Sequence, residues 1–241
     1  DALKYVPGIT ITRSQVNVRG STGFSYGVGT RVLLLVDGLP FLSGDTGEII
    51  WESLPPGQID RVEVVKGAGS ALYGSSALGG VINVITRRVR DRPETQVRSY
   101  AGTYELPKYA SWQWTSDRRT FAGLSMTHSE RINDLSYSVG ASRSVDDGYK
   151  RNDFWKRWNG WGRADIDLSA HRSLGFSFSL LDQRRGSFLY WKDLDHALEP
   201  KDAQLNDRIQ SLRWNVSSRY REYLSSRVSY AVQVSWFRSQ W

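Results

Sequence analysis

The chain has 241 residues, 39% of them hydrophobic, which is enough to bury a core in one or two domains. This composition excludes disordered and collagen-like proteins. Charged residues make up 24%, and no run of about 18 apolar residues occurs, so a membrane-spanning helix is excluded. Transmembrane β-strands are not excluded, because they alternate polar and apolar residues.

Cysteine is absent and histidine occurs three times, so disulfides, thiolate zinc sites and cysteine nucleophiles are excluded. We therefore expect no metal site and no cofactor. The net charge of +7 would suit a nucleic-acid partner, but no block of five or six like charges occurs. The densest basic segment, residues 87–92, is short and interrupted, so we expect no nucleic-acid binding.

The first 90 residues predict a small mixed α/β unit. Runs rich in Val and Ile alternate with Gly-rich connections such as residues 20–29, which is the pattern of short strands joined by turns. One short helix is predicted over residues 70–77. The predicted strands are Ile9–Thr12, Gln15–Arg19, Val32–Asp37, Ile59–Lys66 and Val81–Thr86.

After residue 92 the pattern changes to long segments of period two. One face of each carries aliphatic or aromatic side chains, and the other carries Ser, Gly, Arg and Asn, as over residues 174–180 and 211–219. Turns near 131–134, 169–172 and 221–223 are tight, whereas those at 146–154 and 185–207 are longer. This alternation is typical of an outer-membrane β-barrel. Tryptophans near strand ends predict an aromatic girdle: Trp112, Trp114, Trp155, Trp158, Trp161 and Trp191.

We count about seven strands in this second part, including Thr95–Tyr104 and a long segment, Tyr109–Ser129, with a break near Asp117. Bacterial barrels have an even strand count, and a lumen that holds a folded domain of this size needs roughly 22 strands. We therefore expect the chain to be a fragment of a longer protein.

Enzymatic motifs are incomplete. Gly69 and Gly74 have the spacing of a phosphate-binding loop, but Ser75 stands where that loop needs lysine. No G-x-S-x-G elbow is present. Asp165 and Asp167 share a strand face, which predicts lumen lining more readily than metal binding or catalysis. A nucleotide-using α/β enzyme is thus disfavoured, whereas a soluble or surface β-rich binding module stays open as an alternative.

Four ordered blocks stand out in the first 90 residues: Val18-Arg19-Gly20, residues 32–40 (VLLLVDGLP), residues 59–67 (IDRVEVVKG) and residues 70–86 (SALYGSSALGGVINVIT). These blocks resemble the plug domain of TonB-dependent outer-membrane receptors, in the style of the siderophore and cobalamin branch. The resemblance implies a plug domain over residues 1–92, with its N-terminal part missing, and the first strands of a transmembrane β-barrel over 93–241.

The resemblance further implies active, non-enzymatic transport of a ferric siderophore across the bacterial outer membrane. Cobalamin, another metal chelate or a carbohydrate is the alternative cargo. The partners would be the ligand, membrane lipid, lipopolysaccharide, and TonB through a segment outside this chain.

Strand direction suggests where a ligand would bind. If Gln15–Arg19 descends and Val32–Asp37 ascends, the loops at 13–15 and 41–50 face outward. Polar residues of these loops, with two aromatic residues of the 185–207 loop, are the ligand candidates: Arg13, Ser14, Gln15, Ser43, Asp45, Thr46, Glu48, Tyr190 and Trp191. We expect three other charged residues to pair with the barrel wall: Arg19, Arg61 and Glu63.

Overall fold

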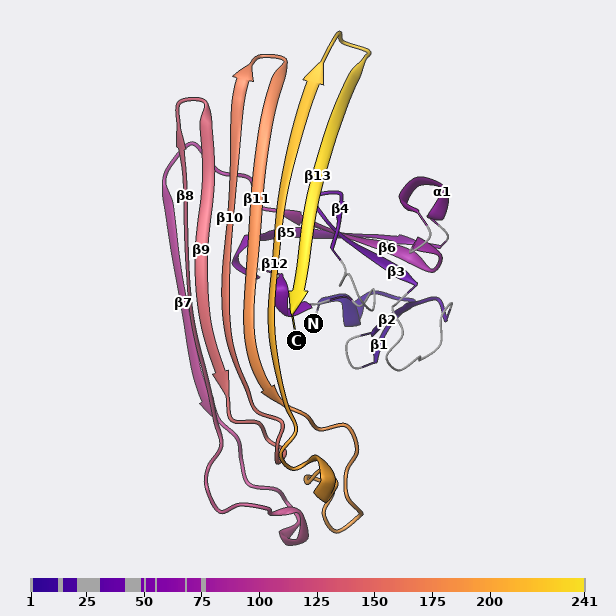
Figure 1. Ribbon diagram of the computed structural model, residues 1–241, viewed down its shortest axis with the longest axis vertical. Helices are drawn as coiled ribbons and strands as arrows, with labels where there is room; N and C mark the ends of the chain where they lie inside the picture. The colour runs from indigo at the N-terminus through magenta and orange to yellow at the C-terminus, as the bar shows by residue number, and fades with distance from the viewer. Residues whose placement is uncertain are drawn as a thin grey trace.

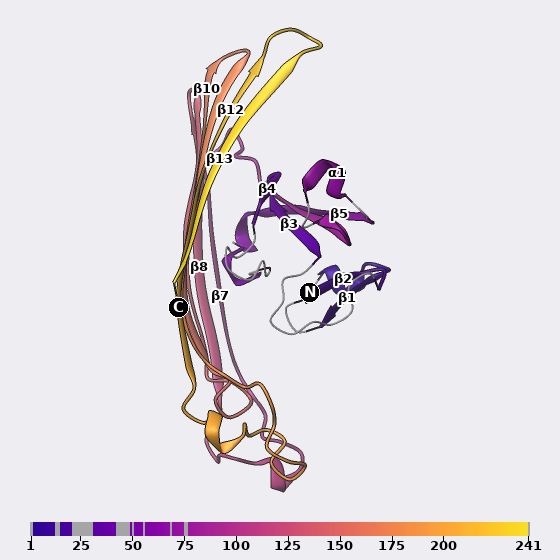
Figure 2. The same cartoon turned by 45° about the vertical axis from the view of Figure 1, so that its right-hand side comes forward.

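The computed structural model describes residues 2–12, 15–20, 31–41, 49, 51–54, 56–67, 69–74 and 77–240. These residues form a small folded unit that lies against a long curved sheet (Figures 1 and 2). We call the first unit the plug and the second the wall. No helix within the described ranges is long and apolar enough to cross a membrane.

The plug is built on a four-stranded sheet with the order β4-β3-β6-β5. Strands β3 (Val32–Val36) and β6 (Gly80–Thr86) are parallel neighbours at its centre. Strand β5 (Ile59–Lys66) pairs antiparallel with β6, and β4 (Leu39–Pro40) pairs antiparallel with β3. Sequence analysis predicted three of these strands to within one residue at each end, but missed the two-residue β4.

Two further plug elements flank this sheet. Strands β1 (Ile9–Thr12) and β2 (Gln15–Val18) form a separate antiparallel hairpin. Helix α1 (Ser70–Tyr73) is shorter than the predicted 70–77 helix. It ends there because Gly74 has a φ of 87°, which leaves the right-handed helical region.

The plug core explains why β3 and β6 are near-continuous apolar runs. On one side of the sheet, Val32 and Leu34 of β3 pack with residues of the β1–β2 hairpin. On the other side, Leu33 and Leu35 pack with Ala77. Because both faces of β3 are buried, its strand lacks the alternation that marks a half-exposed strand.

The wall is a seven-stranded antiparallel sheet in which every strand pairs with its neighbours in the chain. Its concave side faces the plug (Figure 2). This is the predicted strand number and topology. The strands are β7 (Glu94–Thr103), β8 (Thr120–Ile132), β9 (Leu135–Asp146), β10 (Trp155–Ser169), β11 (Arg172–Gly186), β12 (Arg208–Tyr223) and β13 (Ser229–Gln240).

The two faces of the wall have opposite chemistry. On β12, Ser217 is 5% exposed, whereas the adjacent Val216 is 48% exposed. The row of Ser, Arg and Asn side chains therefore points toward the plug, and the row of apolar side chains points away from it. This is the alternation that the sequence predicted for a barrel wall with a wet interior.

The wall has a tight-turn end and a long-loop end (Figure 1). Strands are joined at the tight-turn end by residues 133–134, 170–171 and 224–228, and at the long-loop end by residues 104–119, 147–154 and 187–207. The plug strands run mainly across the wall strands rather than along them (Figures 1 and 2). The assumption that plug strands ascend or descend along the wall is therefore wrong.

Three sequence-based expectations for the wall were also wrong. The predicted strand from Tyr109 does not begin until Thr120, because residues 104–119 form a loop with a 3₁₀ turn at Ala110–Trp112. The turn expected at 221–223 spans 224–228 instead, where Ser225 Oγ accepts hydrogen bonds from the N–H groups of two following residues. Trp161 is buried on the plug-facing side, so it does not belong to an outward girdle.

Candidate functional site

The plug meets the wall where β3 and β6 end side by side. The strands are parallel, and Val36 pairs with Val84, so Asp37 and Thr86 lie at the same edge of the plug sheet. The backbone N–H of Thr86 donates to Asp37 Oδ1 at 3.0 Å, and the Thr86 hydroxyl donates to Asp37 Oδ2 at 2.6 Å. The plug itself therefore orients the Asp37 carboxylate.

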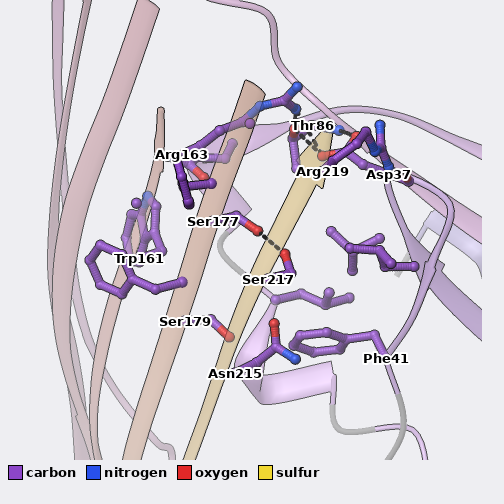
Figure 3. A pocket seen from close by; sticks show the side chains of 18 of the residues that line it. Asp37, Phe41, Thr86, Trp161, Arg163, Ser177, Ser179, Asn215, Ser217 and Arg219 are labelled. Carbon is purple, nitrogen blue, oxygen red and sulfur yellow. Dashed lines mark hydrogen bonds and ion pairs between the residues drawn. The ribbon is translucent and has the colours of Figure 1, made fainter. Parts of the chain in front are cut away.

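Arg163 of β10 extends from the wall to this carboxylate (Figure 3). Its Nη1 donates to Asp37 Oδ2 at 2.9 Å and to the Thr86 hydroxyl at 2.7 Å. Its Nε and Nη2 donate to the two carboxylate oxygens of Asp165 at 2.5 and 3.2 Å. The Arg163 and Asp37 side chains are only 27% and 21% exposed, so water screens their attraction weakly.

A second wall arginine reaches the same turn of the plug. Arg219 of β12 donates from Nη2 to the backbone carbonyl oxygen of Asp37. Between the two arginines, Gly175 of β11 leaves room for Asp165, because a Cβ there would lie 3.0 Å from Asp165 Oδ1. Three neighbouring wall strands thus converge on one plug turn. We call Asp37, Thr86, Arg163, Asp165 and Arg219 the plug–wall cluster.

A cavity of about 90 Å³ lies beside the plug–wall cluster. Phe41 and Leu54 line it from the plug, and Trp161 lines it from the wall. The Trp161 indole Nε1 is buried and has no hydrogen-bond partner among the described residues. A cavity of this volume is large enough to hold ordered water. Two wall hydroxyls, Ser177 and Ser217, hydrogen-bond to each other at its edge.

Other contacts join the plug to the wall. Asn159 of β10 donates from its side-chain amide to the Glu52 carbonyl oxygen at 3.2 Å, and Arg157 Nη2 lies 3.9 Å from Glu52 Oε1. Gln58 donates from Nε2 to Ser138 Oγ of β9 at 2.9 Å. These contacts lie on β9 and β10, so the plug is held at several separate points on the wall.

Asn152 joins two loops at the long-loop end. It has a φ of 62°, a left-handed conformation that asparagine tolerates better than most residues. Its Oδ1 accepts a hydrogen bond from Arg208. Its Nδ2 lies 2.9–3.1 Å from three carbonyl oxygens at either end of the 187–207 loop, those of Ser187, Gln204 and Asp207.

Two ionisable groups at this end have shifted pKa values. Burial, together with donation to Asp146 Oδ2 at 2.9 Å, raises the pKa of Tyr104 to about 12. The hydroxyl of Thr120 donates to Asp147 Oδ2 at 2.7 Å and lowers the pKa of that carboxyl group. Tyr104 therefore stays protonated and Asp147 ionised at neutral pH, and both hydrogen bonds fix the loops to strand ends.

Most of the predicted ligand residues cannot be placed. Gln15 begins β2 and pairs with Thr12. The others in the plug lie outside the described residues: Arg13, Ser14, Ser43, Asp45, Thr46 and Glu48. Their role therefore stays a prediction.

The two aromatic ligand candidates are exposed at the long-loop end. The Lys201 ammonium lies 5.7 Å from the ring centroid of Tyr190, and Trp191 forms a bridge with Pro200. Both contacts join the two arms of the 187–207 loop. Tyr190 and Trp191 thus present aromatic surface on a loop that is itself ordered.

Of the three charges expected to pair with the wall, Arg61 and Glu63 pair with each other on the same strand. Arg61 lies 2.9 Å from Glu63 and 3.1 Å from Asp60, all on β5. These pairs raise the pKa of Arg61. Arg19 lies in the turn after β2, and its N–H donates to the Gly8 carbonyl oxygen. Within the described ranges no wall partner of Arg19, Arg61 or Glu63 is seen, so their pairing with a barrel stays a prediction.

Known proteins resemble this chain in sequence and in architecture. Residues 1–81 match the family model described as the TonB-dependent receptor plug domain. The chain is 42% identical over 123 residues, 51% of its length, to the vitamin B12 transporter BtuB of Vibrio vulnificus strain CMCP6. Residues 1–81 therefore belong to the plug domain family of TonB-dependent receptors. The match spans 20% of the Vibrio protein, so the chain covers only a small part of this relative.

Solved receptors share the fold of the chain. The ferric citrate transporter FecA, in its unliganded form, superposes on 99% of the chain with a TM-score of 0.78 at 15% identity. The ferric yersiniabactin uptake receptor FyuA from Yersinia pestis superposes on 98% with a TM-score of 0.69 at 21% identity. The receptor chain covers 36% and 37% of these two structures. It thus has a plug and part of an antiparallel β-barrel.

The plug–wall cluster is the part of the receptor that sequence analysis did not predict. Asp37 was placed only at the end of a predicted strand, and Asp165 was assigned to lumen lining. Two residues could have indicated this cluster in the sequence: Arg163 and Arg219 each place an arginine on the polar face of a long strand. The cluster binds the plug turn to the wall and orients the Asp37 carboxylate. The relatives are transporters and receptors rather than enzymes.

Proposed function

We propose that the full-length receptor imports a scarce metal chelate across the bacterial outer membrane. One observation carries this proposal: a folded plug is fastened by a half-buried ion pair to the polar face of a wall whose other face is apolar. An apolar outer face suits lipid, and a fastened plug closes the lumen until energy is supplied. TonB would supply that energy through a segment outside this chain. We take residues 1–92 as the plug domain and 93–241 as barrel.

The cargo we propose first is a ferric siderophore, and cobalamin is the second candidate. Several solved receptors of this fold carry siderophore names, such as the ferric yersiniabactin receptor. The Vibrio relative is named for vitamin B12 and shares more sequence identity with the chain. The structural likeness lies below 25% identity and supports the fold alone, so both cargoes require a test.

Growth of a strain that carries this full-length receptor as its sole importer tests the cargo. We expect TonB-dependent growth on a ferric siderophore under iron limitation, and no growth when TonB is inactive. A parallel culture of a cobalamin auxotroph at limiting vitamin B12 tests the second cargo. Growth that does not depend on TonB in either culture would contradict the proposed mechanism.

We also propose that the long-loop end faces the exterior, because outer-membrane barrels have long extracellular loops and short periplasmic turns. In this orientation Tyr190 and Trp191 would contact the ligand from the barrel. Gln15 and the undescribed plug candidates would contact it from below. Carbohydrate import and a soluble or surface binding module are the remaining alternatives.

Neutralising three plug charges tests this ligand site. We expect Arg13→Gln, Asp45→Asn and Glu48→Gln together to lower ligand affinity at least about tenfold, since charged hydrogen bonds contribute about 1.5–3 kcal/mol each. Equilibrium binding to purified receptor measures it, and membrane insertion should not change. Unchanged affinity would remove these residues from the site while leaving transport intact.

A further inference from the structure

The plug-facing side of β11 carries only small side chains along one stretch. The successive plug-facing residues there are Ser173, Gly175, Ser177 and Ser179. Because a strand rises about 3.4 Å per residue, this stretch is about 20 Å long. Ser179 pairs with Trp161 of β10 and with Asn215 of β12, and it lies between them (Figure 3). We call the four β11 residues the β11 track.

The cavity between the plug and the wall lies against the β11 track. Most residues of the track line it from the wall, and Phe41 and Leu54 line it from the plug. Two further lining residues, Ser53 and Trp161, are only 9% and 2% exposed. Each has a side-chain polar atom without a hydrogen-bond partner within the described part of the chain. Because buried polar groups without partners weaken an interface, the plug is bound least firmly to the wall at the cavity.

Contacts that fasten the plug lie on either side of the cavity. Three successive plug-facing residues of β10 show this arrangement: Asn159, Trp161 and Arg163. Asn159 donates to the carbonyl oxygen of Glu52 and Arg163 donates to the carboxylate of Asp37, whereas Trp161 between them lines the cavity. Among the residues that the structure describes, no side chain of β11 is hydrogen-bonded or ion-paired to the plug. The β11 track is therefore a gap between fastened points.

Plug-facing arginines border the β11 track on both neighbouring strands. They lie on β10 and β12: Arg157, Arg163, Arg213, Arg219 and Arg221. The plug-facing acids of these two strands are Asp165 and Asp167. Asp165 pairs with Arg163, and Asp167 pairs with Arg131 of β8. The borders of the track therefore carry a net positive charge.

Asp37 of the plug occupies two of these arginines beside the cavity. Its carboxylate accepts a hydrogen bond from Arg163 at 2.9 Å, and its backbone carbonyl oxygen accepts one from Arg219. Movement of the plug away from the wall would remove Asp37 and leave both guanidinium groups beside the track. Because arginine binds carboxylates and similar oxyanions through paired donors, the site then suits another anion.

We propose that the cargo passes the plug along the β11 track as an anion, and that Arg163 and Arg219 exchange Asp37 for this anion when the plug moves. This inference rests on the proposed transport function. The plug separates from the wall at least cost where it is bound least firmly, and the small side chains of the track leave room there. The same three wall strands thus supply both the route and its preference for negative charge.

Labelling of an introduced cysteine in cells tests the route. The 241 residues contain no cysteine, so Ser177→Cys in the full-length receptor adds one thiol on the track. A negatively charged methanethiosulfonate is added while cells take up a ferric siderophore or, in a parallel culture, vitamin B12. We expect labelling at least about tenfold faster with active than with inactive TonB, because the buried track opens. The matched control is Ser142→Cys on β9, whose residue pairs with Asn159 on the plug-facing side and should label equally in both strains.

The charge of the reagent tests the preference for anions. Each labelling rate is divided by the rate of the same reagent with a free thiol in solution. The negatively charged reagent should then label Ser177→Cys at least about fivefold faster than a positively charged one of similar size. Adding Arg163→Gln and Arg219→Gln should abolish this preference, whereas Arg163→Lys and Arg219→Lys should retain most of it. The ratio of the two rates does not depend on how far the plug opens, so weaker fastening of the plug does not change it.

Uptake without faster labelling of Ser177→Cys would overturn the route. An equal rise at Ser142→Cys would also overturn it, because the plug would then leave the whole wall and not one track. Equal normalised rates for the two reagents would overturn the exchange of Asp37 for an anion. Uptake is measured in the same cells, so these outcomes differ from failure of the proposed function, in which neither the ferric siderophore nor vitamin B12 enters and the inference fails with it.

Discussion

Replacing Arg163 with glutamine is expected to release the plug from the wall at a lower urea concentration than in wild type. Arg163 joins Asp37 and Thr86 of the plug to Asp165 of the wall. Removing one partner of a buried charge pair costs about 3–5 kcal/mol. Both side chains are still about a quarter exposed, so we expect the free energy that holds the plug to the wall to fall by about 2–3 kcal/mol. A fluorophore on a cysteine introduced at Leu72, which is 83% exposed, would report plug mobility.

A matched control for this prediction is Arg131→Gln. Arg131 pairs with Asp167 at 2.9 Å, the distance that also separates Arg163 from Asp37, but with side chains 40% and 50% exposed. An exposed pair contributes about 0–1 kcal/mol, so this variant should release the plug near the wild-type midpoint. Equal midpoints for Arg163→Gln and Arg131→Gln would show that the plug–wall cluster does not fasten the plug.

Replacing Asn152 with leucine is expected to loosen the long-loop end without unfolding the wall. The substitution removes the amide that contacts three carbonyl oxygens of the 187–207 loop, and it places a branched side chain at a φ of 62°. Buried groups left without partners cost about 1–3 kcal/mol, so amide hydrogens of that loop should exchange roughly tenfold to a hundredfold faster. Hydrogen exchange followed by mass spectrometry measures this.

Two further variants separate the causes. Asn152→Gly accepts the left-handed backbone but lacks the amide, so faster exchange there isolates the hydrogen bonds from strain. Asn206→Leu changes an exposed asparagine of the same loop and should leave exchange unchanged. If the loop amides of Asn152→Gly exchange as slowly as those of wild type, the hydrogen bonds of Asn152 do not order the loop.

Loosening this loop should also weaken ligand binding if Tyr190 and Trp191 contact the ligand as proposed. An ordered loop loses less conformational entropy on binding than a mobile one. The same Asn152→Leu receptor therefore links loop order to the proposed site. Its affinity for the proposed chelate should fall together with the protection of the loop amides.

Local pattern was sufficient for most strands. Period-two alternation placed β9, β10 and β11 to within about one residue of their observed ends, because each wall strand has one wet and one apolar face. The alternation pattern failed over residues 109–117, because this aromatic-rich segment has the composition of a strand but folds as a loop. It also misassigned Trp161, because sequence alone does not distinguish a tryptophan facing lipid from one facing the plug.

The sequence by itself determined the strands, the two faces of the wall and the alternation of loop lengths, because these depend on residues close together in the chain. Only the tertiary structure showed the plug–wall cluster, in which Arg163 meets a residue 126 positions away and Arg219 the same residue from 182 positions away. Such pairs form only after the plug docks across the wall strands at one particular height. That height depends on packing between two separately folded sheets, which no local pattern encodes.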